Sequence, residues 1–564
     1  MTWTRRAAEF RRNHRDRLRQ LAHQTRQVLL LAGATGAATG LTVAIFDRLT
    51  ADVLLDAVVR APLAVQVVAP LLGLVVAAAA LRTVGQGVSP ATSDEYIRAF
   101  HDDGGDLRPR QAIARVIASI ATLGSGGPMG YEGPSLYAGA SIGAALERRI
   151  SKVFNLAEPN VLLVCGAAAG VAAIFKAPVT GLVFALEVPY QDDVARHMLL
   201  PAAISSATSY LVFAALAGTE PILPVAGRPP FNFVDLGGAA VIGLVCGLLA
   251  RAFIVIIREA KHLSSRGHPA LRIGIAGGVL GSTVLLGHIL SAQNLVLGPG
   301  YGALTWALNP NRAIVALIVL GTLRVAGTAA VVGGGGAGGL FIPLVIQGAL
   351  VGRAVGGLFE AQTTSLFPVV GMAAFLGAGY RVPLAAVVFV AEFTGRPGFV
   401  VPGLIAAVVA QLVMGRASIS AYQSPGRVGN LEQRLRLPVT TALDLEARVI
   451  APTDTVDDVF SQLLQARQQS VVVVAGDRYC GLVVATDLAH LDRGEWATTS
   501  AADVMRCDVP TAQPSWTASD AVRAMDDAGV DRLAVCDGDR YIGVVAAADI
   551  VRLGELVTDR RRRH

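Results

Sequence analysis

The sequence predicts an all-α polytopic membrane bundle followed by a smaller α/β part that lies in water. Its 564 residues are 53% hydrophobic and only 16% charged, with a mean hydropathy of +0.53. Such a balance is rare in soluble proteins of this length. Apolar runs long enough to cross a bilayer recur between residues 28 and 414. Each of the two parts also repeats itself internally, which indicates duplicated structural units.

Glycine and proline shape the predicted membrane part. The chain has 61 Gly and 27 Pro, and many of them fall within the apolar runs, of which the clearest are 63–81, 161–186, 236–257, 314–332 and 400–414. Broken helices at membrane depth are tolerated only where the freed backbone groups line a cavity or are buried in protein. We therefore expect a bundle of short, tilted and interrupted helices, a pattern that favours a channel or transporter.

Positive charge is concentrated at the two ends of the chain, whose formal net charge is +6. Arginine-rich residues 4–20 precede the first apolar run, and four arginines occupy 560–563. No aromatic interleaving or recognition motif accompanies them, so we do not expect nucleic-acid binding; we interpret both as solvated faces near lipid. Arginine-rich flanks mark the cytoplasmic side, which places the N-terminus there.

The membrane part contains two pairs of matching segments. "GAAAGVAAIFKAPVTGLVFALEV" (166–188) resembles "GMAAFLGAGYRVPLAAVVFVAEF" (371–393) at an offset of 205, and "GYEGP" (130–134) resembles "GLFIP" (339–343) at an offset of 209. Short Gly/Pro-interrupted segments at corresponding places in two halves predict a binding site between the halves, where helix N-termini converge.

The G-x-x-x-P pattern suits anion binding by backbone amides. Glycine permits close approach, and proline fits the first turn of a helix, where its missing N–H costs nothing. A helix N-terminus carries about half a positive elementary charge and unpaired N–H donors. Glu132 stands at such a start, in a stretch of glycines. Its carboxylate would occupy the place of a permeant anion and open the path on leaving; alternatively it only satisfies the first helical turn.

A second repeat fills the C-terminal part. Residues 452–488 match 514–550 at an offset of 62, and each copy predicts an amphipathic helix, a buried strand, a tight turn, a second strand and a short helix. This pattern resembles a pair of CBS (cystathionine-β-synthase) modules. The resemblance implies adenine-nucleotide binding through Asp487 and Asp549. Because Val484 and Ala546 replace the hydroxyl residues of that site, we favour a helix-capping role for both aspartates.

Three membrane motifs resemble the CLC family of chloride channels and chloride/proton exchangers. They are "LGSGGPMGYEGPSLYAGASIG", "GGAGGLFIPLVIQGALVG" and "AAIFKAPVTGLVFALEV", and the resemblance covers roughly residues 30–430. It implies an inverted-repeat bundle, a homodimer and one anion pathway in each subunit. Glu132 resembles the family's external gating glutamate. The implied anion ligands are the amides of Leu340, Phe341 and Ile342 and those near Tyr131 and Gly133.

The sequence departs from the family in its hydroxyl ligands and at the outer motif. Tyr131 replaces the arginine of GREGP. The segment equivalent to GSGIP is "GQGVSPATSDEYIRAF" (85–100), where Gly87 takes the serine position and Ser89 is the nearest hydroxyl. The family's late tyrosine corresponds to "GRASISAYQ" (415–423), with Ser420 in the expected place and Tyr422 two residues on. Fewer hydroxyl ligands predict less sharp selection among anions.

Val188 is the departure that concerns protons. Many family exchangers carry a proton-transfer glutamate at this position, and valine cannot carry a proton. The sequence therefore favours a passive chloride channel gated by Glu132. The alternative is a chloride/proton antiporter of the same family, in which protons are a second transported species.

Two further alternatives involve metal ions. Residues 92–106 contain Asp94, Glu95, His101 and Asp102, but we interpret this stretch as a solvated helix and loop rather than a metal site. A divalent-cation transporter with CBS regulation would need clustered membrane carboxylates. The acids of the apolar segments, among them Glu132, lie in separate Gly/Pro contexts, so this alternative is disfavoured.

The expected organisation follows from these segments. We expect a cytoplasmic basic segment at 1–26, a CLC-like domain at 27–430 with halves at about 27–220 and 230–425, CBS modules at 437–495 and 499–556, and a basic tail at 557–564. No HExxH or CxxC motif is present, and we expect neither an enzyme nor a bound metal. Chloride is the expected ligand and no cofactor is required. The expected location is a bacterial inner membrane with the CBS pair in the cytoplasm.

Overall fold

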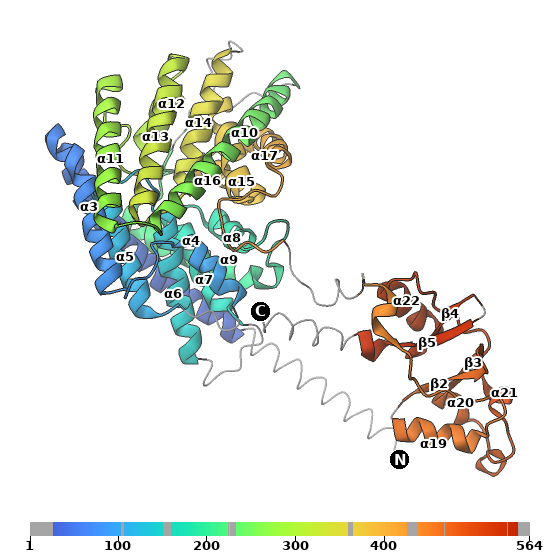
Figure 1. Ribbon diagram of the computed structural model, residues 1–564. Coiled ribbons are helices and arrows are strands. Elements are labelled where there is room, and N and C mark those ends of the chain that lie inside the picture. The colour runs from blue at the N-terminus through green and yellow to red at the C-terminus, as the bar shows by residue number, and fades with distance from the viewer. Residues whose placement is uncertain are drawn as a thin grey trace. The chain divides into compact units, whose positions relative to one another are not determined.

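The protein consists of a helical unit and a smaller α/β unit. The computed structural model describes residues 26–102, 107–150, 159–223, 225, 233–358, 365–425, 435, 437–466, 468–538 and 540–550. The chain divides into unit 1, Met1–Arg427, and unit 2, Val428–His564. Within the described residues, every strand belongs to unit 2 (Figure 1). The predicted fold class is confirmed.

Unit 1 contains two runs of helices that follow one another in the chain. The first run starts with the helix Arg26–Arg60 and comprises η1 (Arg48–Leu55, a π-helical stretch of that helix), α2 (Asp56–Arg60), α3 (Leu63–Thr83), α4 (Ser93–His101), α5 (Pro109–Gly124), α6 (Glu132–Ile150), α7 (Val161–Phe175), α8 (Pro178–Glu187), η2 (Arg196–Met198) and α9 (Leu199–Ala217). The second run comprises α10 (Phe233–Ser264), α11 (Pro269–Ser291), α12 (Tyr301–Leu308), α13 (Ile314–Gly334), α14 (Phe341–Leu358), α15 (Leu366–Tyr380), α16 (Pro383–Thr394), η3 (Pro397–Phe399) and α17 (Val400–Met414).

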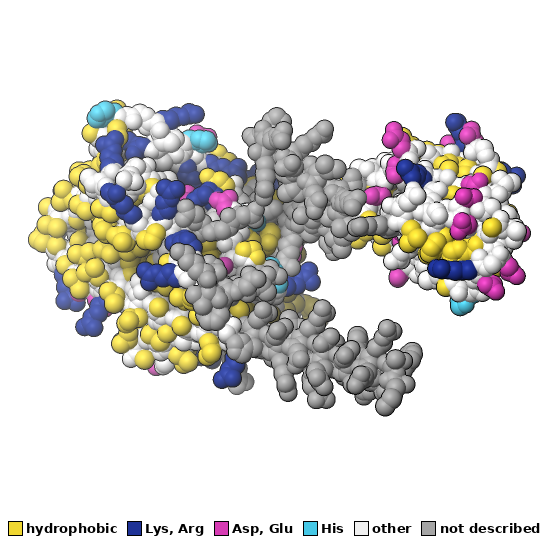
Figure 2. All heavy atoms as spheres, turned by 90° about the horizontal axis from the view of Figure 1, so that it is seen from below, with side chains coloured by type: hydrophobic (Ala, Val, Ile, Leu, Met, Phe, Trp, Pro, Cys, Tyr) yellow, Lys and Arg dark blue, Asp and Glu magenta, His cyan; other side chains and the backbone are white. Residues whose placement is uncertain are grey.

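Unit 1 is built to lie in a bilayer. Among the described residues, seven helices are long and apolar enough to cross a membrane, and they are Arg26–Arg60, Leu63–Thr83, Arg196–Ala217, Phe233–Ser264, Pro269–Ser291, Ile314–Gly334 and Pro397–Met414. Large apolar side chains such as Leu30, Leu211 and Leu412 are exposed on these helices, and Figure 2 shows hydrophobic side chains over much of one face of unit 1. So large an apolar surface would be unfavourable in water, so unit 1 is an integral membrane domain.

Glycine and proline interrupt some apolar runs and leave others intact. The run 161–186 divides where Lys176 adopts a left-handed φ of 52° after α7 and Pro178 begins α8. The run 236–257 instead lies within continuous α10. There a Cβ on Gly243 would lie 2.5 Å from the carbonyl oxygen of Ala406, so this glycine permits close packing on α17 rather than a break.

The repeated segments meet as reciprocal partners. Glu187, at the end of α8, accepts a hydrogen bond of 2.8 Å from the amide of Ala385 in the first turn of α16. Glu392, near the end of α16, accepts one of 2.7 Å from the amide of Thr180 in the first turn of α8. Both pairs are related by the offset of 205 found in the sequence. Each half therefore caps a helix of the other with a carboxylate, which lies in the favourable field of a helix N-terminus.

Matching glycines hold two pairs of helices at close range. A Cβ on Gly166 in α7 would lie 1.9 Å from the carbonyl oxygen of Gly139 in α6. In the second half, a Cβ on Gly371 in α15 would lie 2.1 Å from the carbonyl oxygen of Gly348 in α14. Small residues allow helix backbones to approach closely in membranes, where van der Waals packing drives association. These contacts fix α6 and α14, which begin at the candidate site.

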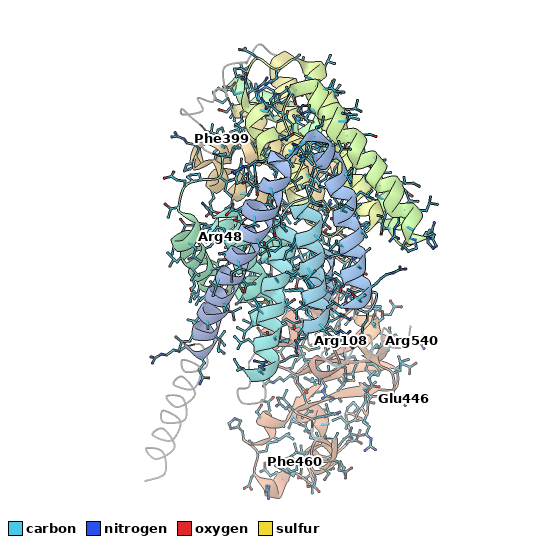
Figure 3. All side chains as sticks on the ribbon, turned by 90° about the vertical axis from the view of Figure 1, so that its left-hand side faces the viewer. Arg48, Arg108, Phe399, Glu446, Phe460 and Arg540 are labelled. Carbon is cyan, nitrogen blue, oxygen red and sulfur yellow. The ribbon has the colours of Figure 1, made fainter. Side chains whose placement is uncertain are left out.

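Unit 2 is a five-stranded antiparallel sheet with short helices. Its elements are η4 (Val439–Ala442), β1 (Leu443–Asp444), α19 (Val456–Ala466), β2 (Ser470–Ala475), β3 (Arg478–Val484), α20 (Ala485–Leu488), η5 (Arg493–Glu495), α21 (Ala501–Val504), α22 (Ala518–Ala528), β4 (Arg532–Asp537) and β5 (Arg540–Ala546). The strand order is β1-β5-β3-β2, and β4 pairs with β5. In Figure 3, Phe460 marks α19 and Arg540 marks the start of β5.

The two copies in unit 2 share fine detail. The hairpins β2–β3 and β4–β5 each shift register once, after Val473 and after Val535. A threonine–aspartate pair caps the helix before each hairpin, and Thr455 matches Thr517. These positions differ by the sequence offset of 62. The predicted order of helix, strand, turn, strand and helix is confirmed for the described residues.

We predict that Gly166→Ala destabilises unit 1. The added methyl group would lie 1.9 Å from a backbone oxygen of α6, and backbone atoms cannot rotate away. Overpacking of this kind costs about 1–3 kcal/mol. The fraction of protein that stays monodisperse on gel filtration after heating in detergent measures the effect.

The matched control is Gly278→Ala in α11, where a Cβ meets no atom within 4 Å. Alanine is the better helix former, by about 1 kcal/mol, so this variant should be at least as heat-resistant as the wild type. Equal melting of the two variants would contradict the packing role of Gly166.

Candidate functional site

Glu132 lies buried where the two halves of unit 1 meet. It is the first residue of α6, its side chain is 2% exposed, and Oε1 accepts a hydrogen bond of 2.7 Å from the amide of Phe341, the first residue of α14. Glu132 and Phe341 are equivalent positions of the GYEGP and GLFIP motifs. The carboxylate thus lies between two helix N-termini, which stabilise negative charge through their N–H donors and partial positive charge.

Gly130 and Gly339 pair through their backbones and lie against the carboxylate of Glu132. Each donates its amide to the carbonyl oxygen of the other, at 2.8 Å in both directions. A Cβ on either glycine would lie 1.9 Å from a carboxylate oxygen of Glu132, so both positions require glycine while the carboxylate is bound. The sequence comparison found these glycines as shared motif positions at an offset of 209, but it did not predict that they pair with each other.

The residues on either side of Glu132 are also buried in this junction. Tyr131 packs its ring edge-to-face on Phe46, with 6.2 Å between ring centroids, and its hydroxyl has no hydrogen-bond partner among the described residues. A Cβ on Gly133 would lie 2.9 Å from Cα of Gly339. Oε2 of Glu132 likewise has no hydrogen-bond partner in the described chain. This oxygen is therefore available to take up a proton.

A cavity of about 290 Å³ ends beside this junction, and we call it the α4 cavity. Its wall includes residues 89–95, which lead into and begin α4, together with Met129, Lys261, Leu340 and Tyr380. Leu340 directly precedes Phe341, which binds Glu132; Phe341 and Ile342 are fully buried behind it. The cavity is thus separated from the glutamate by the first turn of α14.

The acidic side chains of the α4 cavity are paired with cations. Asp94 accepts from Nζ of Lys261 at 2.7 Å, and Glu95 lies 3.4 Å from the guanidinium of Arg115 and 3.1 Å from that of Arg98. Pairing reduces the negative field that these carboxylates would otherwise present to an anion. The wall therefore combines apolar surface with polar groups and carries no strong net charge.

The metal-site alternative for this segment finds no support. His101 contacts the carbonyl oxygen of Pro189 through Nε2 at 2.8 Å, and Asp102 pairs with Arg98 at 2.8 Å. The described residues contain no group of three or more side chains suited to hold a metal ion. The segment forms the helix α4, whose Tyr96, Ile97, Ala99 and Phe100 are buried, so the expectation of a solvated helix is wrong for this part of the stretch.

Ser89 and Gly87 differ in their relation to the cavity. Ser89 lines it, and its carbonyl oxygen and hydroxyl accept from Arg115 at 3.0 and 3.4 Å. Gly87 lies in an exposed turn after α3 with φ of 84°, and its amide donates to Leu81 at 2.9 Å. Gly87 is not among the residues of the cavity wall, and its role as an anion ligand stays a prediction.

The late segment contributes Ile419, Ala421 and Tyr422 to the cavity wall. Of the two expected residues, Tyr422 therefore lines the cavity, and it is 48% exposed. Ser420 is buried and is not among the wall residues, and its hydroxyl has no partner among the described residues. A role of either residue in anion binding stays a prediction. The sequence alone did not fix the register of this short, non-helical segment.

Val188 is fully buried directly after α8. Its carbonyl oxygen accepts from Nε2 of Gln423 at 2.9 Å, and the same nitrogen donates to the carbonyl oxygen of Tyr380 at 2.7 Å. The residue therefore helps to anchor the late segment against α8 and α15. Its apolar side chain offers no site for a proton.

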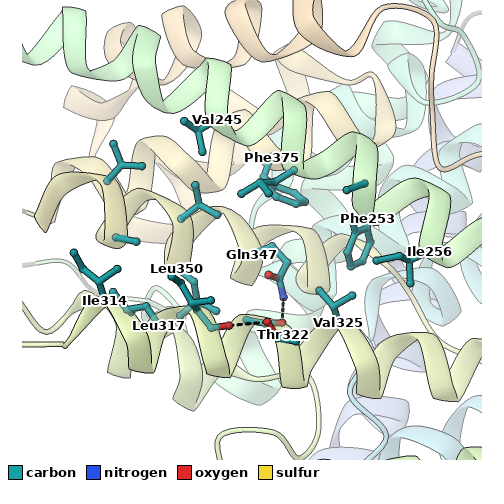
Figure 4. Close-up of a pocket in the computed structure, with 17 residues that line it drawn as sticks. Val245, Phe253, Ile256, Ile314, Leu317, Thr322, Val325, Gln347, Leu350 and Phe375 are labelled. Atoms are coloured by element: carbon teal, nitrogen blue, oxygen red, sulfur yellow. Dashed lines mark hydrogen bonds between the residues drawn. The ribbon is translucent and has the colours of Figure 1, made fainter. Parts of the chain in front are cut away.

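A larger cavity in unit 1 has a different character. It measures about 570 Å³ and lies between α10, α13, α14 and α15 (Figure 4). Its wall is apolar apart from Gln347 and Thr322, whose donors are bonded to Gly321 at 3.1 Å and Ile318 at 2.9 Å. An ion entering it would lose hydration without compensation. This cavity is not a candidate for ion passage.

In unit 2, Asp487 is held by an ion pair. Its carboxylate accepts two hydrogen bonds from Arg506, of 2.6 and 2.7 Å, and this guanidinium lowers the pKa of Asp487. Val484, not Asp487, is the N-cap of α20, so the expected capping role is corrected to an ion pair. Asp549 lies half-buried at the matching place after β5. Arg506 also lines a cavity of about 380 Å³, and a nucleotide using Asp487 would have to displace it.

Comparison with known proteins agrees with this geometry. Residues 71–415 match the family described as voltage gated chloride channel, and residues 501–555 match the CBS domain. A putative chloride channel protein ClcB-like from Ralstonia nicotianae is 26% identical over 61% of this chain and 81% of its own length. An H(+)/Cl(−) exchange transporter ClcA from Yersinia pestis is 28% identical over 56% of this chain and 69% of its own length.

Solved structures share the fold. A slow cyanobacterial Cl−/H+ antiporter superposes with a TM-score of 0.60 at 23% identity, covering 69% of this chain and 94% of its own. A eukaryotic CLC transporter superposes with a TM-score of 0.57 at 17% identity, covering 93% of this chain and 97% of its own. The fold and site define an integral membrane anion transport protein with an internal repeat. The chain belongs to the voltage-gated chloride channel, or CLC, family and carries a C-terminal CBS domain.

We predict that Gly339→Ala displaces the carboxylate of Glu132 and increases chloride leak. The new methyl group would lie 1.9 Å from Oε1, a clash that costs about 1–3 kcal/mol. The bound fraction of the carboxylate should fall roughly 5- to 150-fold. Chloride efflux from loaded proteoliposomes measures the leak.

Gly302→Ala is the control, since a Cβ there meets no atom within 4 Å, and its efflux should equal that of the wild type. Adding Glu132→Ala to Gly339→Ala should change efflux little, because both remove the same obstruction. Fully additive effects would show that Gly339 acts elsewhere.

Proposed function

We propose that this protein exchanges chloride for protons across the membrane, with Glu132 as the group that binds each proton. Support comes from the relatives named H(+)/Cl(−) exchange transporters, which are 28–29% identical to this chain. This proposal replaces the expectation of a passive channel, which relied on Val188 alone.

The position of the Glu132 carboxylate is the observation that carries the proposal. One carboxylate oxygen accepts a hydrogen bond from the amide of Phe341, and the other has no hydrogen-bond partner among the described residues. When it is ionised, the carboxylate accepts hydrogen bonds from backbone amides that could otherwise donate to a chloride ion. Protonation removes its negative charge and weakens that hold, so chloride takes the amides while Glu132 carries a proton. Chloride binding at these amides is thereby coupled to protonation of Glu132.

The proposal requires a proton route that does not use Val188. The α4 cavity contains hydroxyl and carboxylate groups, among them Ser93 and Asp94, and ends one helical turn from Glu132. Such groups, together with water, carry protons. We place the proton route along this cavity. Protons and anions would then share the part of the cavity that lies near Glu132.

The setting of the protein follows from the family and from the charge distribution. We propose a homodimer in a bacterial inner membrane, with the N-terminus and unit 2 in the cytoplasm. The arginine-rich ends of the chain support this orientation. Chloride and protons are the transported species, the protein is not an enzyme, and no adenine nucleotide is needed at the CBS modules for transport.

Exchange and passive conduction make opposite predictions for protons. In proteoliposomes with a chloride gradient and no proton gradient, the wild type should drive protons uphill until the two gradients balance. Glu132→Gln cannot ionise, so it should carry chloride at all pH values without proton movement. An external pH electrode together with a chloride electrode measures both fluxes in one experiment.

Glu259→Gln is the matched control, because Glu259 is exposed on α10, and it should retain coupled exchange. Chloride flux in the wild type without any proton movement would establish passive conduction and overturn the proposal. Unchanged coupling in Glu132→Gln would remove Glu132 from the mechanism.

A further inference from the structure

We propose that the hydroxyl of Tyr380 is a ligand of the transported anion in the α4 cavity. The inference rests on the proposed pathway past Glu132 and names a side chain that contacts the ion on that path. Tyr380 is the last residue of α15 and belongs to neither of the two segments that were expected to supply hydroxyl ligands.

Tyr380 is a buried residue of the cavity wall. It is 3% exposed and lines the α4 cavity together with Ser93 and Leu340. Leu340 directly precedes Phe341, whose amide binds Glu132. An anion in this cavity therefore meets the tyrosine beside the start of α14.

The side chain is held in this position by its surroundings. The ring packs edge-to-face on Phe184, with centroids 5.6 Å apart and planes at 84°. The carbonyl oxygen of Tyr380 accepts from Gln423 at 2.7 Å, and Arg381 follows with a left-handed φ of 58°. The phenol is thus preorganised, so binding an anion costs little ordering of this side chain.

The chemistry of the cavity favours a neutral donor at this point. A phenolic O–H donates a hydrogen bond without a full positive charge, and binding must be weak enough for the anion to leave again. The nearest alternatives do not supply this group: Ile419 has no donor, and Tyr422 is 48% exposed. The late segment thus offers an apolar side chain where α15 offers a hydroxyl.

The test compares Tyr380→Phe with the wild type. The variant keeps the ring and its contact with Phe184, and it removes only the hydroxyl. A hydrogen bond to a charged group is worth enough to weaken chloride binding about tenfold or more. Isothermal titration of the detergent-solubilised full-length protein with chloride measures affinity, and fluxes of chloride and nitrate in proteoliposomes measure selectivity. We expect weaker chloride binding and a smaller preference for chloride over nitrate.

Two further variants distinguish a direct contact between Tyr380 and the anion from an indirect effect of losing a hydroxyl. Tyr210→Phe, which removes a hydroxyl of α9 outside the cavity wall, should bind chloride like the wild type. Ser93→Ala should weaken binding less than Tyr380→Phe. Wild-type affinity and selectivity in Tyr380→Phe would overturn the proposal. So would an equal loss in Ser93→Ala with no further loss in the double variant, because Tyr380 would then act through Ser93.

Failure of this proposal is distinguishable from failure of the proposed exchange. Chloride affinity is measured without any proton gradient, whereas coupling is read from proton movement in Glu132→Gln. If the wild type proves to be a passive channel, Tyr380→Phe should still weaken chloride binding about tenfold.

Discussion

The hydrogen bond between the Glu132 carboxylate and the Phe341 amide is the interaction around which unit 1 is arranged. It requires two helix N-termini to face each other at short range within a membrane domain. Paired backbone hydrogen bonds between Gly130 and Gly339 set that range, and the absence of side chains at both glycines leaves room for the carboxylate. Close packing of α6 on α7 and of α14 on α15, through Gly166 and its counterparts, then fixes the two helices behind the junction.

The internal repeat produces two kinds of contact between the halves, one symmetric and one asymmetric. Glu187 and Glu392 are equivalent residues with equivalent partners, so each caps a helix of the other half and the arrangement is symmetric. Glu132 and Phe341 are also equivalent in the repeat, but one is acidic and the other is apolar. At that place a single carboxylate meets an amide of the other half. The symmetric contacts therefore join the two halves, and the loss of symmetry at the motif leaves one ionisable group between two helix N-termini.

The acidic side chains of the α4 cavity are paired with cations. Asp94, for example, is paired with Lys261, and the neutral side chain of Tyr380 lies in the same wall. Neutral donors hold an ion without trapping it. The apolar cavity between α10, α13, α14 and α15 is larger but offers no such groups. The presence of polar and charged side chains, rather than volume, distinguishes the α4 cavity from this apolar one.

The sequence by itself determined the membrane class, the two repeats, the hairpins of unit 2 and the place of Glu132 at a helix start, because composition, spacing and a lone acid in an apolar setting are local properties. Only the tertiary structure decided which side chains face the α4 cavity. Gly87 lies in an exposed turn after α3, Ile419 rather than Ser420 lines the α4 cavity, and Asp487 is bound by Arg506. Tyr380 lines the same cavity from α15. These outcomes depend on register and on contacts between segments far apart in the chain, and no local pattern encodes either.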